Sequence, residues 1–100
     1  MNDLNRIRLS LHRALLFNVL SSVRFIFIKV ISDKLILTVF SDTDLSLAEK
    51  DIYYSVIGEI TGDFKELDDS ISEVKFIVSQ VQYEELSNKN IGDLVYARYE

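Results

Sequence analysis

The residues of this chain that bear most on chemistry are its carboxylates, its tyrosines and one histidine. His12 is the single histidine, and there is no cysteine. A general base needs a partner group and a pocket, and the sequence contains neither a Gly-x-Ser-x-Gly turn nor a glycine-rich phosphate loop. We therefore expect His12 to be structural or solvent-facing. No catalytic residue is predicted, and the chain is not expected to be an enzyme.

Carboxylates are concentrated in two short segments, one before and one after a predicted helix: Asp42 and Asp44, and then Asp63, Glu66, Asp68 and Asp69. Their spacing matches no EF-hand loop, so neither a metal site nor a cofactor is predicted. Two interpretations stay open. These side chains either form a solvated surface that maintains solubility or a surface that recognises a cationic partner.

The charge of the chain is divided unevenly along the sequence. Residues 1–40 hold six basic and two acidic groups, a balance of +4, whereas residues 41–100 hold five basic and fourteen acidic groups, a balance of −9. The total of −5 argues against a nucleic-acid partner, because Lys and Arg contacts to phosphate dominate that kind of affinity. The pattern predicts a cationic and an anionic region if the two halves keep separate surfaces.

Length and composition favour a single domain over residues 1–100. Hydrophobic residues make up 48% of the chain, which is enough for one core at this length. The absence of cysteine favours a reducing compartment, and no apolar run has the length of a membrane span or the form of a signal peptide. We therefore expect a cytoplasmic location and no contact with a membrane.

Two helices are expected, over residues 3–20 and 47–63. In the first, Ile7, Leu11 and Leu15 share one side, and a second stripe of Leu9, Leu16 and Leu20 is left for other parts of the chain or for a partner. The second helix begins after Ser46-Leu47-Ala48-Glu49, the pattern of a capping box. It is the clearest element in the sequence.

Four strands are expected, over residues 22–31, 35–41, 71–82 and 94–99, because these segments are rich in β-branched and aromatic residues or alternate in polarity. The turn residues 32–34 predict a hairpin between the first two. The order is therefore α-β-β-α-β-β. It predicts an α+β fold, a two-layer sandwich with a mainly antiparallel four-stranded sheet.

Three segments of the sequence resemble the corresponding segments of a known protein family. They are residues 8–16 (RLSLHRALL), the helix from Ser46 to Phe64 with Glu49, Val56 and Asp63, and the closing residues 92–100 (GDLVYARYE). Together they resemble small bacterial immunity proteins of contact-dependent growth-inhibition toxins. The resemblance implies a cytoplasmic protein that binds one toxin domain and blocks its active site or substrate path. Such toxins are commonly nucleases with a basic substrate cleft.

The candidate partner-binding residues come from the charge pattern, since the resemblance supplies no contact motif. We expect the two turns flanking the second helix to bind the toxin, with Tyr54 as an aromatic anchor: Asp42, Asp44, Tyr54, Asp63, Glu66, Asp68 and Asp69. A helix of this length places the two turns about 25 Å apart. An acidic edge of that length could cross a basic groove.

A second class of function is a homo-oligomeric structural or adaptor module. Its motivation is apolar surface that the helices would leave uncovered, expected on one sheet face at Ile26, Ile28, Val30, Ile36 and Phe40. Because two copies of the chain could bury this surface against each other, a homodimer is a further hypothesis. A small enzyme is the third and weakest hypothesis.

Overall fold

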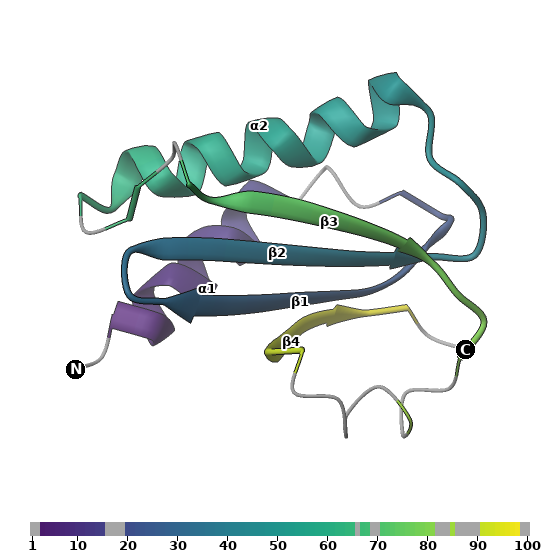
Figure 1. Cartoon of the computed structure of the whole chain (residues 1–100), viewed down its shortest axis with the longest axis horizontal. Helices are drawn as coiled ribbons and strands as arrows, with labels where there is room; N and C mark the ends of the chain where they lie inside the picture. Colours follow the sequence, from purple (N-terminus) through teal and green to yellow (C-terminus); the bar gives the residue numbers. More distant parts are fainter. Residues whose placement is uncertain are drawn as a thin grey trace.

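Two helices pack on one face of a four-stranded sheet in the computed structural model of the chain (Figure 1). The structure describes residues 3–15, 20–65, 67–68, 71–81, 85 and 91–98. The elements are α1 (Asp3–Leu15), β1 (Val23–Ile31), β2 (Lys34–Ser41), α2 (Leu47–Asp63), β3 (Glu73–Val78) and β4 (Asp93–Ala97). The predicted order and the two-layer α+β class are confirmed. Residues 16–19 of the predicted first helix, Leu16 among them, lie outside the described residues, and Leu20, the predicted last residue of the helix, is not helical.

The sheet is mixed, so the prediction of a mainly antiparallel sheet is wrong at β3. The strand order is β3-β2-β1-β4, and β1 pairs antiparallel with both β2 and β4, whereas β2 and β3 are parallel. The reason is the connection. Helix α2 leaves the end of β2 and runs back along the sheet, so β3 starts at the same end as β2, as in any β-α-β unit. Both outer strands, β3 and β4, are edges.

The start of α2 is held by a complete capping box, as the sequence predicts. The Ser46 Oγ accepts a hydrogen bond from the Glu49 N–H at 3.1 Å, and the Glu49 carboxylate accepts one from the Ser46 N–H at 2.8 Å. Two of the otherwise unpaired amides at this helix end are thereby satisfied. The helix spans the predicted residues, Leu47–Asp63.

Replacing Ser46 with alanine is expected to lower the free energy of unfolding by about 1 kcal/mol, because the Glu49 amide loses its acceptor. Urea unfolding monitored by circular dichroism measures this. The matched control is Ser55→Ala on the exposed middle of the same helix, where alanine should leave stability unchanged or raise it slightly. Equal effects of the two substitutions would contradict the capping role.

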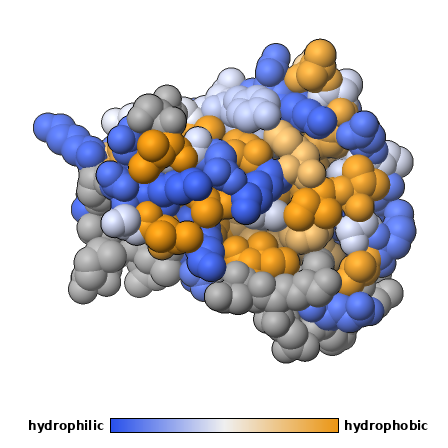
Figure 2. Space-filling model, viewed as in Figure 1, coloured by the Kyte–Doolittle hydropathy of each residue, from blue (hydrophilic) through white to orange (hydrophobic). Residues whose placement is uncertain are grey.

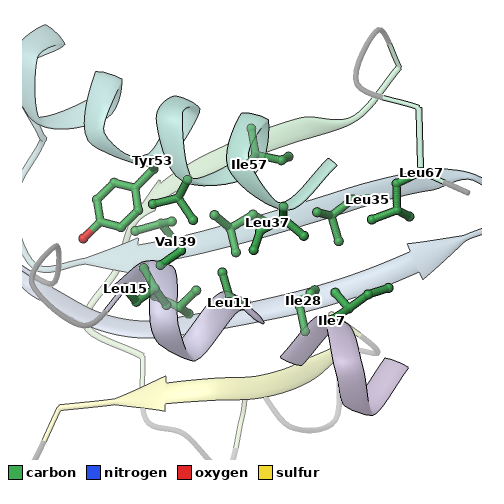
Figure 3. Close-up of a cluster of buried hydrophobic side chains, with 14 of the residues drawn as sticks. Ile7, Leu11, Leu15, Ile28, Leu35, Leu37, Val39, Tyr53, Ile57 and Leu67 are labelled. Atoms are coloured by element: carbon green, nitrogen blue, oxygen red, sulfur yellow. The ribbon is translucent and has the colours of Figure 1, made fainter. Parts of the chain in front are cut away.

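The main core lies between the helices and the sheet (Figure 3). It is formed by side chains from both helices and the two central strands, among them Ile7, Leu11, Ile28, Leu37, Tyr53 and Ile60. The Tyr53 hydroxyl is buried and makes no hydrogen bond within the described part of the chain. Burial raises the pKa of this phenol above its ordinary value, and the nearby Leu20 backbone only partly opposes the shift.

The other face of the sheet has a smaller cluster of Phe25, Phe27 and Phe40. The sequence predicts an uncovered apolar sheet face that includes Ile26 and Ile28, and this prediction is wrong. Ile26 and Ile28 are fully buried beneath the helices, because the antiparallel register sets them opposite Val39 and Leu37. Leu20, expected on an outer stripe, also packs against the main core. The helix-free face therefore exposes less apolar surface than the sequence suggests.

Candidate functional site

The structure separates the predicted acidic edge into different environments. Asp42 is half-buried, and its carboxylate accepts from the Arg98 guanidinium at 2.9 Å. The same Arg98 nitrogen donates to the Ser21 carbonyl at 2.7 Å. The Asp42–Arg98 pair therefore joins the chain after β2 to the chain after β4, which is a structural role.

Asp63 faces α1. Its carboxylate accepts from the Ser10 hydroxyl at 3.3 Å, and it lines a depression of about 290 Å³ together with Arg6, Arg13 and Phe64. The Arg6 guanidinium lies 5.3 Å from the centre of the Phe64 ring. Asp63 thus belongs to surroundings that are largely cationic, and the structure does not join it to the other carboxylates.

Asp68 lies in a larger depression, of about 610 Å³, at the end of α2. This depression is lined by Asp33, Gly58, Thr61, Gly62, Lys65, Leu67 and Asp68. The Asp68 N–H donates to the Asp33 carbonyl at 2.7 Å, so the hairpin turn between β1 and β2 is fastened to the loop that follows α2. Two exposed aspartates from distant parts of the sequence consequently share one hollow.

The hollow is open on its α2 side, where two glycines carry no side chain. Gly58 and Gly62 are four residues apart and so share one side, and a Cβ built on either glycine would have no atom within 4 Å. Glycine within a helix is less stable than alanine by about 1 kcal/mol. The helix therefore has a lower intrinsic stability at the place where its surface is hollow.

Gly58→Ala is expected to raise the free energy of unfolding by roughly 0.5–1 kcal/mol, because the methyl group meets open space and the helical propensity improves. Thermal unfolding by calorimetry tests this. Gly62→Ala, closer to the helix end, should give a smaller gain. A loss of stability in either variant would show that the space is occupied.

Aromatic and aliphatic side chains gather at the other end of α2. Tyr54 and Phe76 of β3 meet edge to face, with ring centres 5.7 Å apart, and the Lys50 ammonium lies 5.5 Å from the centre of the Phe76 ring. The Lys50 ammonium is also 3.8 Å from an Asp44 carboxylate oxygen. Leu47 is 82% exposed, Val78 53% and Tyr54 50%, which is unusually open for such side chains.

These features share the side of α2 that faces β3, because Leu47, Tyr54, Gly58 and Gly62 follow the three-, four- and seven-residue spacing of one helical side. We call this the α2–β3 surface. It consists of Asp33, Asp44, Leu47, Lys50, Tyr54, Gly58, Gly62, Asp68, Phe76 and Val78. In Figure 1, α2 runs along the β3 edge of the sheet over its whole length.

The structure therefore brings together three of the seven residues selected from the sequence, Asp44, Tyr54 and Asp68. It places Asp42 and Asp63 elsewhere, and Glu66 and Asp69 lie outside the described residues. Sequence reasoning missed Asp33, because a turn residue gives no sign of which loop will lie beside it. Two glycines four apart in a well-predicted helix were a signal that could have pointed to the hollow.

The α2–β3 surface offers carboxylates, one ammonium group, one phenol and apolar side chains. Within the described ranges, no group of three or more His, Cys, Asp or Glu residues could hold a metal ion. His12 lies away from this surface, where its Nε2 is 3.1 Å from the Val95 carbonyl oxygen. No helix within the described part of the chain is long and apolar enough to cross a membrane.

Comparison with known families gives a match over residues 4–100 to the model described as MafI2 immunity protein. The chain belongs to the MafI2 immunity protein family. The match includes nearly all of α1 and every later element, so the α2–β3 surface lies within the family domain. A search of curated proteins found no match. The resemblance to small bacterial immunity proteins seen in the sequence is thereby confirmed, and the MafI2 family name associates this chain with immunity to a toxin.

Proposed function

We propose that this chain binds the cognate toxin domain in the cytoplasm and neutralises it by direct contact, without catalysing a reaction. The observation that carries this proposal is membership of the MafI2 immunity protein family over almost the whole chain. The α2–β3 surface supports it, since aromatic and aliphatic side chains left half-exposed beside charged groups are typical of recognition surfaces. Toxin delivery by contact-dependent growth inhibition fits the same proposal.

The toxin domain is proposed to be a nuclease. Asp44 stands at one end of the α2–β3 surface, and Asp33 and Asp68 stand at the other. A nuclease must hold a polyanion, so its substrate groove is cationic, and an acidic surface would be drawn to it by long-range attraction. Binding across that groove would exclude the nucleic acid.

Co-expression with the cognate toxin region tests the proposed function. The chain should co-purify with that region at a fixed ratio and suppress its nuclease activity in a stoichiometric titration. A toxin region that neither binds nor loses its activity would contradict the proposal. A toxin that is inhibited but has another activity would contradict only the nuclease assignment.

A homo-oligomeric module is the alternative function, and the structure weakens its motivation. Of the apolar residues expected on an open sheet face, Ile26, Ile28, Ile36 and Phe40 are buried. Sedimentation velocity at tens of micromolar distinguishes the two functions. We expect the mass of a monomer in the absence of the toxin, and a dimer would favour the alternative.

A further inference from the structure

Strand β3 is an edge of the sheet, and no other strand in the described ranges pairs with its outer backbone groups. The strand order ends at β3, which pairs with β2 on one side only. Among the residues that the structure describes, Figure 1 shows no strand beyond β3, and α2 runs above it. Natural edge strands are commonly protected by proline, by a bulge or by a covering segment. The sequence of β3, EVKFIV, contains no proline.

The direction of the free backbone groups follows from the pairing with β2. The Ser79 N–H donates to the Ser41 carbonyl at 2.9 Å and so continues the ladder between the two strands. Backbone direction alternates along a strand, so Val74, Phe76 and Val78 turn their N–H and C=O groups away from β2. No hydrogen bond to these groups occurs within the described part of the chain.

The surroundings of this edge fit an additional strand. The side chains of Val74, Phe76 and Val78 share the helix side of the sheet, since they pair in register with Leu37, Val39 and Ser41. A strand placed beside β3 would extend the helix side of the sheet and lie next to α2. There Leu47 and Tyr54 are exposed, and Gly58 leaves space. Figure 2, viewed onto the opposite, helix-free side of the sheet, shows hydrophobic side chains on either side of a hydrophilic band. Apolar side chains of an added strand would therefore meet apolar surface on the helix side. On the other side β3 presents Glu73, Lys75 and Ile77, so the added strand would meet charged as well as apolar groups there.

The chain that follows β3 is tied to β1 by hydrogen bonds. Buried Arg24 of β1 donates to the carbonyls of Ser79 and Val81, both at 2.9 Å, and these residues follow β3 directly. A fixed edge avoids the conformational entropy that a mobile segment would lose on binding.

We infer that a strand of the toxin domain adds to the free edge of β3 and extends the sheet to five strands. This inference rests on the proposed function and specifies how the partner is held. Main-chain hydrogen bonds to Val74, Phe76 and Val78 give affinity, and side-chain contacts with Tyr54 and Leu47 give specificity. The added strand is apolar at alternate positions and basic at its ends, because Asp44 lies near one end of β3 and Asp33 and Asp68 lie near the other.

Amide hydrogen exchange measured by NMR tests the inference directly. The probe is the cognate toxin domain, in an inactive form, added to the full chain. We expect at least tenfold slower exchange at the amides of Val74, Phe76 and Val78 in the complex, with no change at the other edge, β4. A complex that leaves these three amides unchanged would overturn strand addition and leave the proposed function intact.

Val78→Pro provides a matched test by mutation. Proline removes one outward N–H at the end of the strand while the ladder bonds to β2, made by the neighbouring residues, are kept. The affinity for the toxin domain should fall about tenfold or more, since one hydrogen bond is lost and the ring obstructs the edge. Val78→Thr keeps the N–H and should change the affinity by less than about threefold.

Two other outcomes also decide the question. Equal effects of Val78→Pro and Val78→Thr would overturn main-chain pairing at this edge. If the same amides become more protected from exchange as the concentration of the free chain rises, the edge binds a second copy of this chain and not the toxin. Failure of the toxin domain to bind at all would overturn the proposed function together with this inference.

Discussion

Association with the toxin domain is expected to slow by about tenfold or more at low ionic strength when Asp33 and Asp68 are both replaced by lysine. The two aspartates share the hollow at the end of α2, so the double change reverses the local field that attracts a cationic groove. The effect should shrink as salt is added, because exposed charges more than about 10 Å apart are screened at 0.1 M ionic strength. Stopped-flow association at several salt concentrations measures it.

The matched control for this charge reversal is the pair Glu59→Lys and Asp93→Lys. Both residues are exposed and lie outside the α2–β3 surface, and the net charge changes by the same amount. An association rate that falls equally in both double variants would show that total charge matters and the hollow does not. Asp42→Lys is expected to act differently, by destabilising the fold, because it removes a carboxylate that the Arg98 guanidinium binds.

The largest change in stability is expected for Gly92→Ala, a loss of about 3 kcal/mol in the free energy of unfolding. Gly92 has φ of +138°, which L side chains rarely adopt, and a Cβ there would lie 2.4 Å from the Ile28 carbonyl oxygen. Backbone strain and overpacking each contribute roughly 1–3 kcal/mol. Because Ile28 also pairs with Asp93, the backbone would have to move where β4 joins the sheet.

Calorimetry should record this loss as a melting temperature lower by more than about 10 °C for a domain of this size. Gly58→Ala is the natural control, since the same chemical change there should stabilise the protein. Opposite signs for the two variants would confirm that close backbone approach is required at Gly92 and that α2 is open at Gly58. A Gly92→Ala variant as stable as the natural chain would mean that β4 can shift freely.

Local patterns in the sequence were enough to predict each element. The capping box at Ser46 is satisfied by atoms three residues apart, so it depends on nothing distant in the chain. The periodic apolar side of α2 likewise identified Tyr53, Val56 and Ile60 as core residues. These predictions succeeded because the interactions behind them act within one or two helical turns.

Strand register and direction could not be predicted in the same way. The alternation in β1 is apolar on both faces, so the sequence alone did not reveal whether Ile26 or Phe27 lies beneath the helices. Likewise, residues 71–82 read as a strand whichever neighbour they pair with. Only the path of α2 back across the sheet makes β3 parallel to β2 and leaves it at the edge.

The sequence by itself determined that the chain is an acidic α+β domain with two helices and four strands, and it already resembled an immunity protein. Only the tertiary structure decided which charges belong together. Asp33 and Asp68 lie close together because the Asp68 N–H donates a hydrogen bond to the Asp33 carbonyl in the hairpin turn. The Asp42 carboxylate instead binds Arg98, 56 residues away. Recognition surfaces combine residues that are distant in sequence. Contacts over such distances depend on the packing of the whole sheet, which no local pattern specifies.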